Sequence, residues 1–180
     1  MRSRSKILDA VREVIGQSGF SSVTIASVAQ AAGVTRQTVY SIFGTREDLV
    51  SQAVSEHLTN LVASLHEQLA QAPSPLDYVV DLIVTCRAIV HSDALLAVLL
   101  QSGGDNPISE PGALDRARSV GAQMLSPLRE LFPDADLNFD DIADLSIHLG
   151  WSVVCFDDPA VRSDEELRAC LTRWMAPVFP

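Results

Sequence analysis

The feature that most constrains this chain is a helical spacing of apolar residues that continues through nearly all of it. In the first segment, Ile7, Leu8, Val11 and Ile15 fall on one face of a helix that Gly19 ends. No segment has the alternating pattern of a strand bounded by hairpin turns. The chain is therefore predicted to be all-α.

Capping residues and Gly or Pro breaks divide this pattern into about nine helices. Their predicted ranges are 4–18, 24–32, 35–43, 45–69, 75–90, 94–101, 112–131, 139–156 and 163–177. Ser102–Pro107 is predicted to be a loop, because Gly, Asp, Asn and Pro cluster there.

The chain has 180 residues, 47% of them apolar and 20% charged, enough to bury a sizeable core in one or two domains. Surplus apolar surface is often buried against a second copy, so we expect a homodimer. Cys86, Cys155 and Cys170 lack C-x-x-C spacing and are interpreted as reduced core residues. The longest apolar run, Ala94–Leu100, is too short to span a bilayer, and Met1–Lys6 does not begin a signal peptide. We expect a cytoplasmic protein without membrane contact.

Charge is divided unevenly along the chain. Residues 1–46 hold six basic and two acidic side chains, whereas residues 47–180 hold seven basic and 21 acidic ones. A basic head on an acidic body favours contact with a polyanion through the head alone, although chance asymmetry of solvated faces gives the same pattern.

Thr24–Phe43 has the pattern of a helix-turn-helix. Small Ala29 permits a close helix crossing, Gly33 suits the turn, and Val39 and Phe43 fill the crossing. The exposed side of the second helix is left with residues that hydrogen-bond base edges and phosphates, namely Arg36, Gln37, Thr38, Tyr40 and Ser41. Helical hairpins without a DNA role also carry polar faces. The basic head and the caps favour DNA.

Residues 7–54 resemble the tetracycline-repressor (TetR) family of bacterial transcriptional regulators. The matching pieces are Gly19-Phe20, Thr24, Val28-Ala29, Ala32-Gly33-Val34-Thr35, Thr38-Val39-Tyr40, Phe43 and Leu49. The resemblance implies three DNA-binding helices in a domain of residues 1–46, followed by a six-helix ligand-binding and dimerisation domain of residues 47–180.

The resemblance also implies how DNA is bound. The helix at 35–43 would lie in the major groove, with Arg36 and Gln37 at base edges, Thr38 and Tyr40 on phosphates, and Arg46 on a phosphate at the next helix N-terminus. The full predicted contact set is Thr24, Thr35, Arg36, Gln37, Thr38, Tyr40, Ser41, Thr45, Arg46, Arg4 and Lys6. Arg4 and Lys6 are assigned either to an arm that reaches DNA or to a solvated terminus.

Two residues depart from the family pattern. Gln37 stands where the family often has a small residue, which adds a candidate base reader. Ile42 stands where the family often has His, which removes a backbone contact.

A dimer would present two recognition helices to a palindromic double-stranded operator. The family usually pairs its last two helices, which here carry Leu145, Leu149, Val153, Leu167, Leu171 and Trp174; core packing would give the same spacing. A small, largely apolar effector would bind the body and release the operator. Its candidate pocket residues, each also readable as an ordinary core or surface side chain, are His57, Tyr78, Cys86, His91, Met124, Trp151 and Cys155.

Catalytic and metal sites are not expected. The chain has no G-x-S-x-G, no H-E-x-x-H and no Gly-rich phosphate loop, and its four His lack metal-ligand spacing. We therefore predict a DNA-binding regulator, most commonly a repressor in this family, with no enzyme activity and no cofactor. The alternative is a helical small-molecule-binding or scaffold protein that does not use its helix-turn-helix on DNA.

Overall fold

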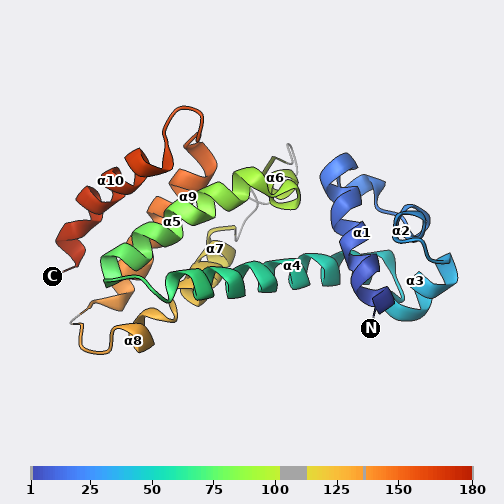
Figure 1. The fold of residues 1–180 in the computed structure, drawn as a ribbon, viewed down its shortest axis with the longest axis horizontal. Coiled ribbons are helices and arrows are strands. Elements are labelled where there is room, and N and C mark those ends of the chain that lie inside the picture. The colour runs from blue at the N-terminus through green and yellow to red at the C-terminus, as the bar shows by residue number, and fades with distance from the viewer. Residues whose placement is uncertain (1, 102–112, 136, 180) are drawn as a thin grey trace. The chain divides into compact units, whose positions relative to one another are not determined.

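The computed structural model describes residues 2–101, 113–135 and 137–179, and every regular element in these ranges is helical (Figure 1). The all-α prediction is confirmed; the loop expected at Ser102–Pro107 lies outside the described residues. Two compact units are present. We name residues 1–61 and 93–101 the head unit, and residues 62–92 and 102–180 the body unit. The division expected at residue 46 separates DNA binding from ligand binding and dimerisation. It does not describe how the chain packs, and it stays a prediction.

The head unit is built from helices α1 to α3, the first part of α4, and α6. Their bounds are α1 (Arg2–Ser18), η1 (Phe20–Ser22), α2 (Ile25–Ala32), α3 (Arg36–Phe43), α4 (Arg46–Leu69) and α6 (Ala94–Gln101). Gly19 at φ 76° ends α1, and Gly33 at φ 65° ends α2, both in conformations that a Cβ resists.

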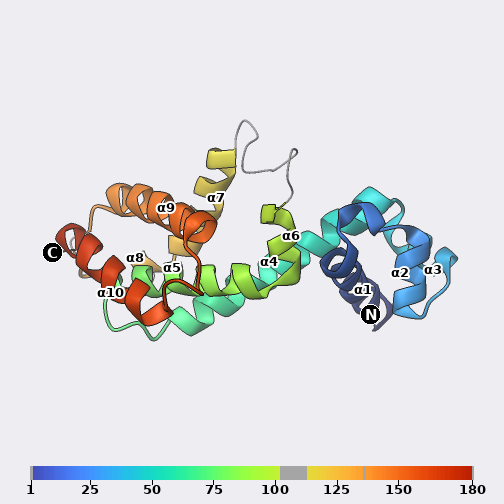
Figure 2. The ribbon, with the colours of Figure 1, turned by 90° about the horizontal axis from the view of Figure 1, so that it is seen from above.

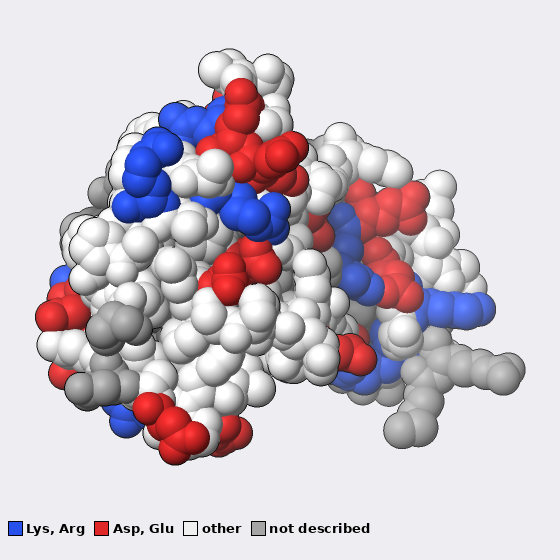
Figure 3. Space-filling model, turned by 60° about the vertical axis from the view of Figure 1, so that its left-hand side comes forward, with Lys and Arg blue, Asp and Glu red and all other residues white. Residues whose placement is uncertain are grey.

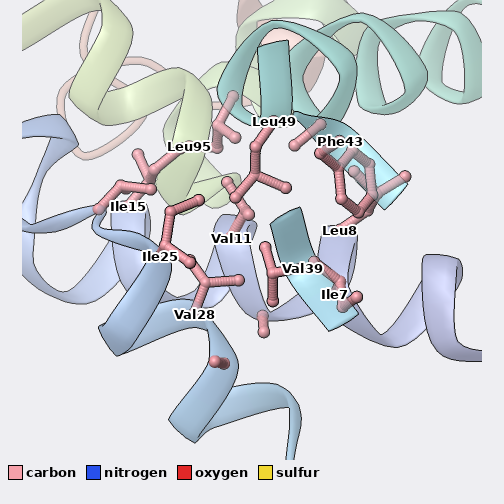
Figure 4. Packing of buried hydrophobic residues seen from close by; sticks show 14 residues of the cluster. Ile7, Leu8, Val11, Ile15, Ile25, Val28, Val39, Phe43, Leu49 and Leu95 are labelled. Carbon is pink, nitrogen blue, oxygen red and sulfur yellow. The ribbon is translucent and has the colours of Figure 1, made fainter. Parts of the chain in front are cut away.

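Apolar side chains from all of these helices meet in one core (Figure 4). Ile7, Leu8 and Val11 of α1 face Val39 of α3, and Phe43 lies beside them. Leu49 of α4 and Leu95 of α6 join the same cluster (Figure 4). The core therefore seats α3 against α1 and α4, and it makes α6 part of the head unit.

The body unit is arranged around α5. Its elements are the second part of α4, α5 (Pro75–Ser92), α7 (Ala113–Leu125), α8 (Leu128–Leu131), α9 (Phe139–Phe156), α10 (Asp164–Met175) and η2 (Ala176–Val178). Helix α5 packs against both α9 and α10, as the two ribbon views show (Figures 1 and 2). It buries residues around much of its circumference, as expected from its apolar sequence.

The single helix expected over residues 112–131 is a wrong prediction. Helix α7 ends at Leu125, and α8 begins at Leu128 after Pro127. Proline has no backbone N–H and its ring clashes with the preceding turn, so it separates the two helices. The Ser126 hydroxyl donates to the carbonyl oxygen of Gln123 at 2.8 Å and closes the end of α7.

A fully buried arginine fixes the connection between α9 and α10. Arg87 of α5 donates from Nη1 to Asp157 and from Nη2 to Asp164, each at 2.6 Å. Asp157 follows the last residue of α9, and Asp164 is the first residue of α10. The Arg87 guanidinium therefore holds both helix ends against the central helix.

Candidate nucleic-acid interface

Helix α2 starts with a reciprocal cap. The Thr24 hydroxyl accepts the backbone N–H of Ser27 at 3.0 Å, and the Ser27 hydroxyl accepts that of Thr24 at 2.9 Å. Two N–H groups that the helix itself leaves unpaired are thereby satisfied. Thr24 thus has a structural role as well as its predicted place beside DNA.

Helix α3 presents a polar face to solvent. Its N-cap Thr35 accepts the backbone N–H of Thr38 at 3.1 Å, while Val39 and Phe43 are buried in the head core. The opposite side of the helix leaves Arg36, Gln37, Tyr40 and Ser41 exposed. This short helix thus exposes a guanidinium, an amide and two hydroxyl groups together, as base and phosphate recognition requires.

Two other α3 side chains differ from that polar group. Thr38 is half-buried, and its hydroxyl lies 2.8 Å from the Thr35 hydroxyl, so it is already paired within the cap. Ile42 is 39% exposed and adds an apolar side chain to the solvent side of α3.

Arg46 forms backbone contacts in addition to its predicted role at DNA. Its Nε donates to the carbonyl oxygen of Val23 at 2.5 Å, and its Nη2 donates to that of Phe20 at 2.7 Å. Both carbonyls belong to the connection between α1 and α2, which no local pattern around residue 46 could have indicated. Nη1 lies 3.6 Å from Glu47. The predicted phosphate contact of Arg46 stays a prediction.

Arg4 lies in α1, which begins at Arg2, rather than in an extended arm. Its Nη1 is 2.5 Å from Glu56 of α4, and Nη2 donates to Gln52 at 3.3 Å. The guanidinium also lies 5.9 Å from the centre of the Phe43 ring. These contacts tie α1 to α4. Lys6, on the same helix, is exposed, and so is Thr45, whose hydroxyl caps α4 by accepting the Asp48 N–H at 3.0 Å.

The predicted pocket residues fall into different places. Tyr78 and Cys86 of α5 both contact Met124 of α7: the Tyr78 hydroxyl donates to the Met124 carbonyl oxygen at 2.8 Å, and the Cys86 sulfur lies 3.9 Å from the Met124 sulfur. Burial raises the pKa of Tyr78 to about 12 and that of Cys86 to about 11, so both stay neutral. These three residues form a weakly polar group in the body unit.

The other four pocket candidates lie at further positions on α9, on α5 and in the head unit. Trp151 and Cys155 are half-buried on α9, and His91 is exposed at the end of α5. Burial also raises the pKa of Cys155. His57 lies in the head unit between Arg12 and Asp93.

The residues predicted for the dimer interface differ in exposure. Leu167 and Leu171 are fully enclosed in the body core and Val153 is buried, because α10 and α9 both pack on α5. Leu145 and Leu149 are half-buried. Trp174 is 53% exposed, and two large apolar side chains missed by the sequence analysis, Phe156 and Val161, are 82% and 84% exposed.

Charged residues leave a broad part of this surface uncovered. Figure 3 turns the side that carries α10 toward the viewer, and a wide area of uncharged side chains lies below a border of acidic and basic ones. Phe156 is the last residue of α9 and Val161 lies in the loop before α10, so helical spacing does not indicate that either belongs to an interface.

Within the described ranges, no group of three or more His, Cys, Asp or Glu side chains is arranged to hold a metal ion. None of the described helices combines the length and the apolar character that a bilayer span requires.

Comparison with known proteins finds a family model that matches part of the head unit. Residues 7–53 match the model of the bacterial regulatory proteins of the tetR family. The transcriptional regulator AlkX of Mycobacterium tuberculosis is 36% identical over 66 residues, which is 37% of this chain and 31% of AlkX. The match thus spans about a third of that relative.

Solved structures share the fold over almost the whole chain. GusR of Salmonella enterica has a TM-score of 0.70 at 17% identity and covers 99% of this chain and 95% of its own. FadR of Bacillus subtilis, solved with stearoyl-CoA, has a TM-score of 0.63 at 17% identity, covering 97% of both chains. At these identities the likeness establishes the fold.

Proposed function

We propose that this chain is a sequence-specific DNA-binding transcriptional regulator of the cytoplasm, because residues 7–53 match the model of the tetR family of bacterial regulatory proteins. The observation that carries this proposal is the solvent-exposed face of α3, where Arg36, Gln37, Tyr40 and Ser41 lie opposite the buried Val39 and Phe43. Arg36 and Gln37 stand in the first turn of α3, the part of a recognition helix that contacts base edges.

The proposed active form is a homodimer on a palindromic operator. Trp174, Phe156 and Val161 give the body unit exposed apolar surface, which a second copy would bury. A twofold dimer presents two α3 helices, so the half-sites should lie about one helical turn apart or slightly more. Repression follows when such a dimer covers a promoter.

We propose a small, largely apolar effector for the body unit. The buried core of the body is mainly aliphatic and includes Tyr78, and the half-buried Cys86 and Met124 pack against it. FadR of Bacillus subtilis, which shares the fold, was solved with stearoyl-CoA. A long-chain acyl-CoA is therefore the first probe, and free CoA is its control.

Selection of bound duplexes from a random DNA pool tests the proposed function. The protein should enrich a palindrome, and its affinity for that palindrome should fall as salt rises, because phosphate contacts release counterions. Stearoyl-CoA, but not CoA, should then release the protein. Failure of a folded dimer to enrich any sequence would favour the alternative, a helical binding or scaffold protein that does not use α3 on DNA.

A further inference from the structure

Polar side chains join three helices inside the head unit. Arg12 of α1 has its Nη1 atom 3.1 Å from Nδ1 of His57 on α4, and the Nε2 atom of His57 lies 2.7 Å from Oδ2 of Asp93. The other Asp93 oxygen accepts the backbone N–H groups of Leu95 and Leu96, both at 3.0 Å, at the start of α6. The His57 side chain is only 13% exposed. One imidazole ring thus connects α1 to the capped end of α6.

The two contacts define which ring nitrogen carries the proton. A guanidinium has donors and no acceptor, so Nδ1 of His57 accepts from Arg12. Nε2 then carries the hydrogen and donates to the Asp93 carboxylate. The geometry therefore requires a neutral His57 with its hydrogen on Nε2.

Helix α6 is firmly seated where this ring holds it. Leu95 is buried in the head core. A Cβ added to Gly16 of α1 would lie 2.8 Å from the Cβ of Ala94, which is closer than real side chains approach. The polar contacts and the close packing therefore act on the same end of α6.

Protonation of the His57 ring would have opposite effects on its contacts with Arg12 and with Asp93. Protonation would add an N–H at Nδ1 that opposes the Arg12 donor and its positive charge, whereas the Asp93 contact would become an ion pair. Arg12 also pairs with Asp9 of its own helix, and can keep that partner when it leaves the ring. Next to His57 on α4, Glu56 pairs with Arg4. A proton on His57 thus breaks the link to α1 and keeps the link to α6.

We propose that His57 is a proton-sensitive latch, which ties α1 to α4 and α6 only while its ring is neutral and so makes DNA binding weaker in acid. The proposal rests on the proposed function. The latch would affect DNA binding because α1 supports the recognition helix: Ile7, Leu8 and Val11 of α1 form the core on which α3 is seated. A proton added to an imidazole turns its acceptor nitrogen into a donor. His57 is the histidine of the head unit; His66, His91 and His148 belong to the body unit.

Nitrogen NMR of protein labelled at histidine and arginine tests the latch without DNA. At pH 8 the His57 ring should be neutral with its hydrogen on Nε2. On acidification, the side-chain signals of Arg12 should shift together with those of the ring, and His57→Gln should abolish that shift. A neutral ring with its hydrogen on Nδ1, a charged ring at pH 8, or Arg12 signals that ignore the titration would overturn the proposal.

Operator affinity at pH 7.5 and 5.5, at constant salt, tests the functional step. Glutamine offers an acceptor and a donor but does not titrate, so His57→Gln should keep its affinity. On acidification, the operator affinity of the wild type should fall at least about fivefold more than that of the variant. Fivefold is the lower end of the coupling usually found between two sites in one protein. His148→Gln, on exposed His148 of the body, should behave like wild type.

The outcomes of the two experiments are separable. Equal pH dependence in wild type and His57→Gln would overturn the latch while leaving DNA binding intact. Absence of DNA binding at both pH values would refute the proposed function. The NMR signals of Arg12 would then be the remaining test of the latch.

Discussion

The guanidinium of Arg46 holds the carbonyl oxygen of Val23 at 2.5 Å from its Nε atom and so joins the start of α4 to the segment that precedes α2. A second donor of the same group binds Phe20. The helix-turn-helix is therefore held from two sides, by the apolar core and by this one side chain. The residue predicted to contact phosphate is also a structural link.

Replacement of Arg46 is expected to affect stability as well as DNA binding. Arg46→Ala removes two charge-assisted hydrogen bonds and leaves two carbonyl groups to water, so the free energy of unfolding should fall by about 1 to 3 kcal/mol. Arg36→Ala, at an exposed α3 position, should change it by less than about 0.5 kcal/mol. Urea unfolding followed by circular dichroism measures both. Equal stability of the two variants would contradict the link.

Loss of Arg87 should be more costly than loss of a surface ion pair of similar geometry. Arg87→Met removes two charge-assisted hydrogen bonds, to Asp157 and Asp164, and leaves Asp157 only Arg162 at 3.6 Å, so we expect a loss of about 3 kcal/mol. Arg168 pairs with Asp81 at 2.7 Å but is 48% exposed, so Arg168→Met should cost less than about 1 kcal/mol. Chemical unfolding of both variants makes the comparison. Similar losses would show that burial of Arg87 does not matter.

Alkaline pH should destabilise the body unit through Cys86. Burial raises the pKa of its thiol from 9.0 to about 11, so between these values the unfolded chain releases a proton that the folded chain keeps. Stability is complete below pH 9 and falls as pH rises toward 11. Cys86→Ala should be less stable than the wild type at every pH, but its free energy of unfolding should fall less between pH 9 and about 11. Unfolding in guanidinium chloride at closely spaced pH values measures this difference. The same dependence of the free energy of unfolding on pH in the wild type and in Cys86→Ala would contradict the prediction.

Dimer formation should depend on the exposed apolar side chains of α9 and α10. Trp174→Glu places a charge where a second copy would bury an indole ring, so the dimer dissociation constant should rise at least about tenfold. Val120→Glu is the matched control, because Val120 is 43% exposed on α7. Sedimentation at several concentrations measures both, and an unaffected Trp174 variant would place the interface elsewhere.

The helix-turn-helix was predictable because its signals are local. Thr24 and Thr35 cap the helices that the sequence indicated, and Val39 and Phe43 are buried as the spacing required. Pro127 was an equally local signal for the break between α7 and α8, but the apolar spacing on both sides concealed it.

Contacts between distant segments were not predictable in the same way. The Arg46 bonds to Phe20 and Val23 involve backbone carbonyls, which carry no residue signature. His57 was grouped with Tyr78 and Met124 because all three have soft or polar side chains. Residue type alone could not show that His57 lies in the head unit and the other two in the body unit. Helical spacing predicts that a residue such as Leu167 is buried, but it does not distinguish a chain's own core from a partner's surface.

The central claim is that the exposed face of α3 reads base sequence, and Arg36 tests it most directly. The measurement is the affinity of wild type, Arg36→Ala and Arg173→Ala for the selected operator and for versions with each base pair changed in turn. Arg36→Ala should lose about 1 to 3 kcal/mol on the operator and become indifferent to the base pair it contacts. Arg173, exposed on α10, should be replaceable without either effect. Unchanged affinity and base preference in Arg36→Ala would contradict the claim.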